Sequence, residues 1–127
     1  MKDPKAPIGV FDSGVGGLTV LKALRRLLPR EEFLYFGDTA RVPYGGKPLA
    51  MVRRFAWEIA GFLLRQGVKA IVVACNTAAA ALPVRELQRE LTAAGLTTPV
   101  VGVIDPGAQS LVRATKSGVV GVIGTIG

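Results

Sequence analysis

Short apolar runs recur along this chain and alternate with longer stretches in which apolar residues return every three or four positions. Short apolar runs that hold β-branched residues and are bounded by Gly or Pro predict strands. The predicted strands are residues 7–11, 33–36, 70–74, 100–104 and 119–123. The third run, AIVVA, is apolar throughout, which is typical of a parallel strand covered on both faces.

Helical periodicity fills the intervals between these runs. Residues 49–66 give the clearest helix, and Gly67 is placed to end it. A helix that ends before Pro29 presents one apolar face, formed by Val20, Leu21, Leu24, Leu27 and Leu28. The helix after the third strand is interrupted or restarted near Pro83, and Asp105 is the predicted N-cap of the following one.

Strands that alternate with helices, without hairpin signals, predict parallel βαβ units. The expected fold class is therefore α/β, with a parallel sheet flanked by helices. A polar, proline-containing loop near residues 97–99 suggests a first α/β domain over 1–97 and the start of a second over 98–127. No helix follows the last predicted strand to cover it, so we expect this second domain to be incomplete.

Composition limits the class of protein. Half of the residues are hydrophobic and a fifth are charged, which suits a folded α/β domain. The apolar runs are too short to cross a membrane, and the N-terminus lacks the apolar segment of a secretory signal. A single cysteine, Cys75, can form neither an internal disulfide nor a zinc site. We therefore expect a cytoplasmic protein with no bound metal.

The formal net charge of +7 raises the question of nucleic acid. The basic residues are scattered over the polar faces of several predicted helices and are not interleaved with aromatic residues, so we expect no nucleic-acid surface. The chain contains no histidine. Acid–base chemistry near neutral pH would therefore depend on Cys, Asp, Glu, Lys or Tyr.

Ligands of open parallel sheets bind beyond the carboxyl ends of the strands. Applied to the first three predicted strands, this rule gathers a thiol, carboxylates, hydroxyls and an amide at one edge of the sheet. The candidate residues are Asp12, Ser13, Tyr44, Gly45, Cys75, Asn76 and Thr77.

Cys75 stands where an apolar strand stops and a tract of small residues begins, in VVACNTAAAA. The start of a helix stabilises a thiolate, and Asn76 and Thr77 can donate hydrogen bonds to a substrate carboxylate. The alternative role for this cysteine is buried core filler. We expect Asp12 to orient or deprotonate the thiol, the alternative being a helix cap, and Asp38 to close its own loop.

The glycine-rich turn DSGVGG resembles a phosphate-binding loop only in part. It matches neither the P-loop nor the complete G-x-G-x-x-G pattern, and no lysine follows it. A tight turn from strand to helix also explains these glycines. A non-catalytic phosphate- or nucleotide-binding module stays open as an alternative.

Several longer motifs occur in order: GVFDSGVGGLTV, GDTARVPYG, VVACNTAAAA, VVGVIDPG and GVVGVIGTIG. In sequence and spacing they resemble the N-terminal half of the glutamate racemases, in the aspartate/glutamate racemase family. The resemblance implies a cytoplasmic isomerase that interconverts L- and D-glutamate without a cofactor and supplies D-glutamate for peptidoglycan, cell wall biogenesis and cell shape. It also implies a homodimer of full-length chains, each with two α/β domains and the active site between them.

The resemblance further implies a two-base mechanism, in which two cysteines face opposite sides of the substrate α-carbon. By position, Cys75 matches the first cysteine, and Asp12 matches a residue implicated in activating it. The matched substrate contacts are Asp12, Ser13, Tyr44, Gly45, Asn76 and Thr77. The second cysteine of the family lies in a Cys-Thr-His motif that is absent here, so we expect this chain alone to be inactive. A racemase of aspartate or a related amino acid is the alternative enzyme.

Overall fold

The computed structural model describes residues 3–126. Its strands are β1 (Ile8–Asp12), β2 (Phe33–Gly37), β3 (Ala70–Val73) and β4 (Val100–Gly102). Its helices are α1 (Leu18–Leu27), α2 (Leu49–Arg65), α3 (Asn76–Ala81), α4 (Val84–Ala93) and α5 (Ile104–Ala114). None of the helices in the described part of the chain is long and apolar enough to cross a membrane.

The four strands form one sheet in the order β2-β1-β3-β4, and every pair is parallel. This arrangement confirms the predicted α/β class. From β1 the chain moves to one side for β2 and then crosses to the other side for β3. The carboxyl ends of β1 and β3 therefore flank a topological switch point, the place where open α/β sheets bind ligands.

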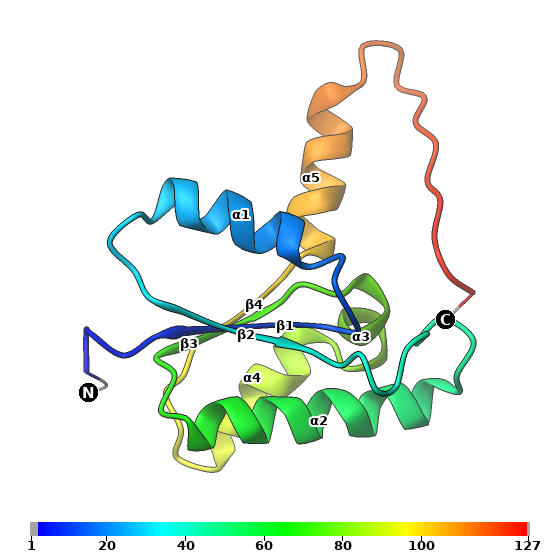
Figure 1. Ribbon diagram of the computed structural model, residues 1–127. Helices are drawn as coiled ribbons and strands as arrows, with labels where there is room; N and C mark the ends of the chain where they lie inside the picture. Colours follow the sequence, from blue (N-terminus) through cyan, green and yellow to red (C-terminus); the bar gives the residue numbers. More distant parts are fainter. Residues whose placement is uncertain (1–2, 127) are drawn as a thin grey trace.

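Helices cover both faces of the sheet (Figure 1). On one face, α2, α3 and α4 bury the larger apolar cluster, which includes Phe11, Ile71 and Val73. On the other face, α1 packs over a smaller cluster around Val10 and Val72. Alternate residues of β1 and β3 thus enter different clusters, as the continuous apolar pattern of β3 predicted.

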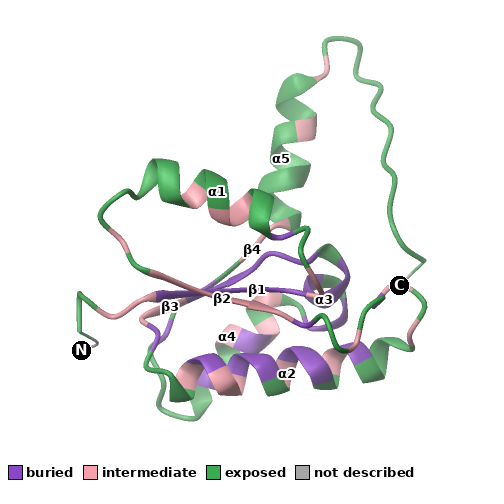
Figure 2. Ribbon diagram, in the orientation of Figure 1, coloured by how far each residue is buried: buried purple, intermediate pink, exposed green. Residues whose placement is uncertain are grey.

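Helix α2 has the apolar face that its sequence predicted, and Figure 2 shows it as a purple stripe turned toward the sheet. Gly67 follows this helix with φ of +77°, a left-handed conformation that suits glycine after a helix end. The break near Pro83 is also confirmed, because α3 ends at Ala81 and α4 starts at Val84.

Val20, Leu21 and Leu24 of the predicted apolar face of α1 pack on the sheet, whereas Leu27 and Leu28, at the C-terminal end of the helix, are 77% and 41% exposed. Two local predictions were wrong. Residues 119–123 form no strand, since no described segment pairs with them. Helix α5 starts at Ile104 after Val103, which places Asp105 inside the first turn and not at the N-cap.

Candidate active site

A cleft of about 440 Å³ opens beyond the carboxyl ends of β1 and β3. Four predicted site residues line it, namely Asp12, Cys75, Asn76 and Thr77. Two other concavities, of about 500 Å³ beside α1 and about 310 Å³ beside α3 and α4, contain no thiol. The switch-point cleft is therefore the place where the chemistry expected from the sequence comes together.

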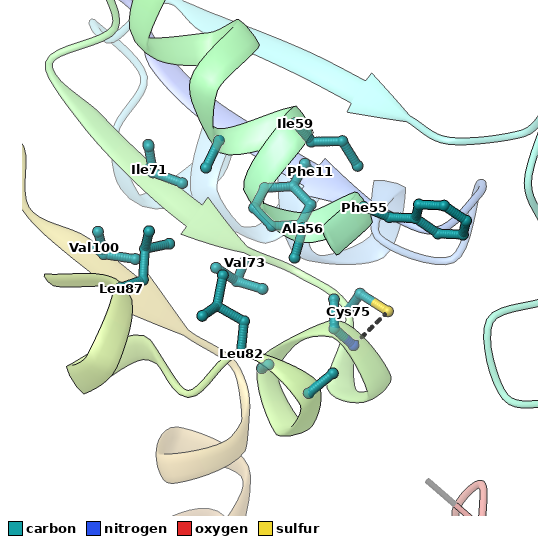
Figure 3. Close-up of a cluster of buried hydrophobic side chains, with 14 of the residues drawn as sticks. Phe11, Phe55, Ala56, Ile59, Ile71, Val73, Cys75, Leu82, Leu87 and Val100 are labelled. Atoms are coloured by element: carbon teal, nitrogen blue, oxygen red, sulfur yellow. Dashed lines mark hydrogen bonds between the residues drawn. The ribbon is translucent and has the colours of Figure 1, made fainter. Parts of the chain in front are cut away.

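Cys75 lies between the apolar core and this cleft. It is the N-cap of α3, with an extended backbone, and its Sγ accepts the N–H of Ala78 at 3.4 Å. The residue is only 6% exposed and belongs to the larger apolar cluster. Figure 3 shows the sulfur at the edge of that cluster, at the start of α3, while Phe11 and Val73 fill the interior. The thiol is thus largely desolvated and still faces the cleft.

Asp12, the last residue of β1, organises the glycine turn that follows it. Its Oδ2 accepts the N–H of Gly17 at 2.9 Å and the N–H of Gly14 at 3.2 Å. These bonds satisfy backbone donors at the entry to α1, as a cap does. The carboxylate is buried and lines the same cleft as Cys75. Asp12 therefore makes the contacts of a helix cap and also lines the same cleft as the thiol.

The thiol is followed by two polar residues that meet the cleft differently. Asn76 is exposed at the start of α3. Thr77 is buried, and its Oγ1 lies 3.0 Å from Oγ1 of Thr125. Both side chains can hydrogen-bond a ligand in the cleft.

The structure does not bring Ser13, Tyr44 or Gly45 into the lining of the cleft. Ser13 is half-buried beside Asp12. A Cβ on Gly45 would lie 2.6 Å from Cγ2 of Thr125, which is itself a lining residue, so Gly45 borders the cleft.

Tyr44 is buried, and its hydroxyl donates to Asp38. Burial, followed by the hydrogen bond and charge of Asp38, raises the pKa of Tyr44 far above its ordinary value. The hydroxyl therefore remains a donor at physiological pH. Asp38 also accepts Nε of Arg41 at 2.7 Å, and the Arg41 guanidinium lies 4.0 Å from the Phe55 ring centroid. Asp38 thus closes its loop, as the sequence predicted.

Sequence reasoning missed several residues of the cleft, namely Gly16, Thr19, Val20, Ala74, Val103, Gly124 and Thr125. Thr125 is the most informative, because it reaches Thr77 from 48 positions along the chain. The sequence did contain a signal for Thr125, because it follows an apolar run, as the predicted site residues Asp12 and Cys75 do. Within the described residues, no group of three or more His, Cys, Asp or Glu side chains could hold a metal ion.

No protein-family model matches the chain. Comparison with curated proteins gives 74% identity to a glutamate racemase of Thermus thermophilus, over 99% of this chain and 47% of the relative. The chain is similar to glutamate racemases over almost its whole length. It spans about half the length of the curated relatives it matches, which fits the N-terminal half to which the sequence motifs pointed.

Solved glutamate racemases share the fold. The Thermus thermophilus enzyme in complex with beta-chloro-D-alanine matches with a TM-score of 0.77 and 80% identity, over 86% of this chain and 40% of that chain. The Francisella tularensis glutamate racemase in complex with D-glutamate matches with a TM-score of 0.75 and 45% identity, over 86% and 40% of the two chains. The racemase-like α/β fold expected from the sequence is therefore confirmed.

Proposed function

We propose that this chain supplies one half of a glutamate racemase, in which Cys75 exchanges the α-proton on one face of glutamate. The observation that carries the proposal is that Cys75 and Asp12 share one cleft at the switch point of the sheet. The similarity to glutamate racemases supports glutamate as the substrate. The complete enzyme then acts without a cofactor in the cytoplasm and provides D-glutamate for peptidoglycan, and so for cell wall biogenesis and cell shape.

The proposed step is a proton transfer from carbon to sulfur. The Cys75 thiolate takes the α-proton and becomes a thiol, while the electron pair of the broken C–H bond remains on the α-carbon and delocalises into the carboxylate. A second acid then returns a proton to the opposite face. The position of Cys75 supports this step, because its sulfur is shielded from bulk water at the edge of the cleft and the N–H of Ala78 can stabilise negative charge on it.

Asp12 has two parts in this proposal. Its carboxylate holds the turn that leads into α1, and in the same cleft it is the proposed acceptor of the thiol proton when the thiolate forms. Asn76 and Thr77 are the proposed donors to the substrate carboxylates, together with Ser13 and the backbone N–H of Gly45. Tyr44 serves that loop through its hydrogen bond to Asp38 and not through a free hydroxyl.

The second acid must come from outside this sequence. The chain has one cysteine and no histidine, so it cannot place a second thiol on the opposite face of the substrate. We propose that the missing half of the active site belongs to a second α/β domain, which begins within residues 98–127 as predicted, and that full-length chains form a homodimer.

The test compares Cys75→Ser with the wild type in the protein as its source gene encodes it. Exchange of the glutamate α-proton with solvent deuterium, followed by NMR, is expected to fall by at least about 10²- to 10⁴-fold, because a serine hydroxyl is not ionised near neutral pH as a thiol can be. Thr92→Val is the matched control, since its hydroxyl donates to a backbone carbonyl on the distant helix α4. Undiminished exchange in Cys75→Ser would refute the proposal, and faster exchange of aspartate than of glutamate would reassign the substrate.

A further inference from the structure

Tyr35 connects the second strand to the glycine turn after the first. It lies in β2 beside Val10 of β1, and its side chain packs against the smaller apolar cluster under α1. Its hydroxyl donates to the carbonyl oxygen of Gly14 at 3.0 Å, a contact between residues 21 positions apart. A tyrosine needs no such contact to fill a core, since a phenylalanine would occupy the same space.

The peptide of Gly14 is held from several sides. Its N–H donates to Oδ2 of Asp12, and its carbonyl oxygen accepts the hydroxyl of Tyr35. A Cβ on Gly37 would lie 2.4 Å from that same oxygen, so the turn passes in direct contact with the end of β2. The position of Gly14 is therefore set by Asp12 on one side and by β2 on the other.

Three side chains also lie close to Gly17, in the same turn. A Cβ at this position would lie 2.6 Å from Cβ of Asp12, 3.0 Å from the hydroxyl oxygen of Tyr35 and 3.1 Å from Cβ of Ala74. Ala74 directly precedes Cys75 in the chain. The hydroxyl of Tyr35, the side chain of Asp12 and the residue before Cys75 thus all lie close to Gly17.

The electrostatic surroundings keep this hydroxyl protonated. Burial raises the pKa of Tyr35 above its ordinary value, and the negative charges of Asp12 and Cys75 raise it further. The hydroxyl is therefore a constant donor to Gly14, whatever the protonation state of the thiol nearby.

We propose that Tyr35 is a positioning residue, whose hydroxyl holds the turn from Asp12 to Gly17 so that the Asp12 carboxylate stays fixed in the cleft beside Cys75. The effect of the Tyr35 hydroxyl on turnover rests on the proposed function, whereas its effect on the turn does not. Tyr35 does not touch the reacting atoms. It acts through Gly14 and Asp12, so its loss changes the chemical step and leaves substrate binding largely intact.

The experiment uses Tyr35→Phe in the protein as its source gene encodes it, with Thr92→Val as the hydroxyl-deletion control. For glutamate racemisation, kcat is expected to fall at least about tenfold while KM changes little. The pH profile of Cys75 alkylation by iodoacetamide is expected to be displaced, and the amides of Gly14 and Gly17 to exchange faster with deuterium. A purely structural hydroxyl would leave the alkylation profile unchanged.

The alkylation and amide readouts need no glutamate, so they separate this inference from the proposed function. An unchanged kcat and an unchanged alkylation profile in Tyr35→Phe would overturn the positioning role, as would equal changes in Thr92→Val. A wild type that exchanges no glutamate α-proton would overturn the proposed function alone. Gly37→Ala, whose new methyl group would press on the Gly14 carbonyl from the end of the same strand β2, must displace the profile too, even where Tyr35→Phe folds poorly.

Discussion

Single polar side chains fix the loop that follows β2. Asp38 receives the hydroxyl of Tyr44 and the guanidinium of Arg41, and Arg41 also binds Glu58 on α2. The ring of Tyr44 packs against Phe55, with 5.7 Å between the ring centroids. A loop that carries Gly45 to the border of the cleft is therefore tied to the long helix by one carboxylate and its two donors.

Tyr44→Phe removes one of these donors and leaves a buried carboxylate with fewer partners. At pH 8 the free energy of unfolding is expected to fall by about 1–3 kcal/mol. The folded state raises the pKa of Tyr44, so its contribution is complete below the unfolded pKa of about 10 and is lost as the pH rises further. Urea unfolding should therefore show a smaller difference in the free energy of unfolding between wild type and variant at pH 11 than at pH 8. An equal difference at both pH values would contradict this prediction.

At the scale of elements, α1 is attached through its glycine-rich entry. None of its residues is fully buried, so the helix depends on partial packing of one face and on the contacts of Asp12 with the turn. Helix α2, in contrast, buries six residues against the sheet. The two helices should therefore respond differently to small changes at their glycines.

Gly17→Ala is expected to destabilise the protein by about 1–3 kcal/mol, because the new methyl group would overlap Asp12 and approach Tyr35 and Ala74. Gly61→Ala within α2 is the matched change. Its Cβ would meet only the flexible end of Arg65 at 3.5 Å, and alanine is the better helix former, so a gain of about 0.5–1 kcal/mol is expected. Urea midpoints of the two variants should move in opposite directions, and equal losses would contradict the prediction.

The core under α4 gives a second comparison between leucines. Leu87 is fully buried, and Leu87→Ala is expected to cost about 2–5 kcal/mol of unfolding free energy. Leu27→Ala, at a residue 77% exposed, should change it by no more than about 0.5 kcal/mol. Thermal or urea unfolding measures both, and a large loss at Leu27 would show that its side chain is covered in solution.

At the scale of the whole molecule, the order of the strands creates the cleft. β1 and β3 lie side by side although α1, β2 and α2 separate them in the chain, and this brings Asp12 beside Cys75. Beyond β4, α5 and the following segment extend from the sheet and return toward the loop after β2 (Figure 1). Thr125 meets Thr77 there. The division into two domains at residue 97 stays a prediction, and β4, which follows that position, pairs with β3 in the same sheet.

The 127-residue chain by itself is expected to convert no L-glutamate to D-glutamate, because it can serve only one face of the α-carbon. Polarimetry or chiral chromatography measures this, with an intact glutamate racemase such as that of Thermus thermophilus as the positive control. Slower alkylation of Cys75 in the native sample than in urea would show that the thiol is buried as in the folded cleft. Racemisation by the isolated chain that survives Cys75→Ser would contradict the two-base proposal.

The sequence by itself determined the features that depend on near neighbours. Apolar runs located β1 to β4, helical periodicity located α2, and the glycine after α2 has the positive φ expected of it. The rule that ligands bind where strands end then selected Asp12, Cys75, Asn76 and Thr77, which do line one cleft. These inferences succeed because strand ends and helix ends are encoded locally.

Only the tertiary structure decided the contacts between distant segments. It joined Tyr44 to Asp38, brought Thr125 to Thr77, placed the hydroxyl of Tyr35 on Gly14, and left residues 119–123 without a strand partner among the described residues. The periodicity of a segment states which of its faces is apolar, but not which other segment will meet that face. Burial and hydrogen bonding at this site depend on contacts between segments that are far apart in the chain, so only the folded chain as a whole decides them.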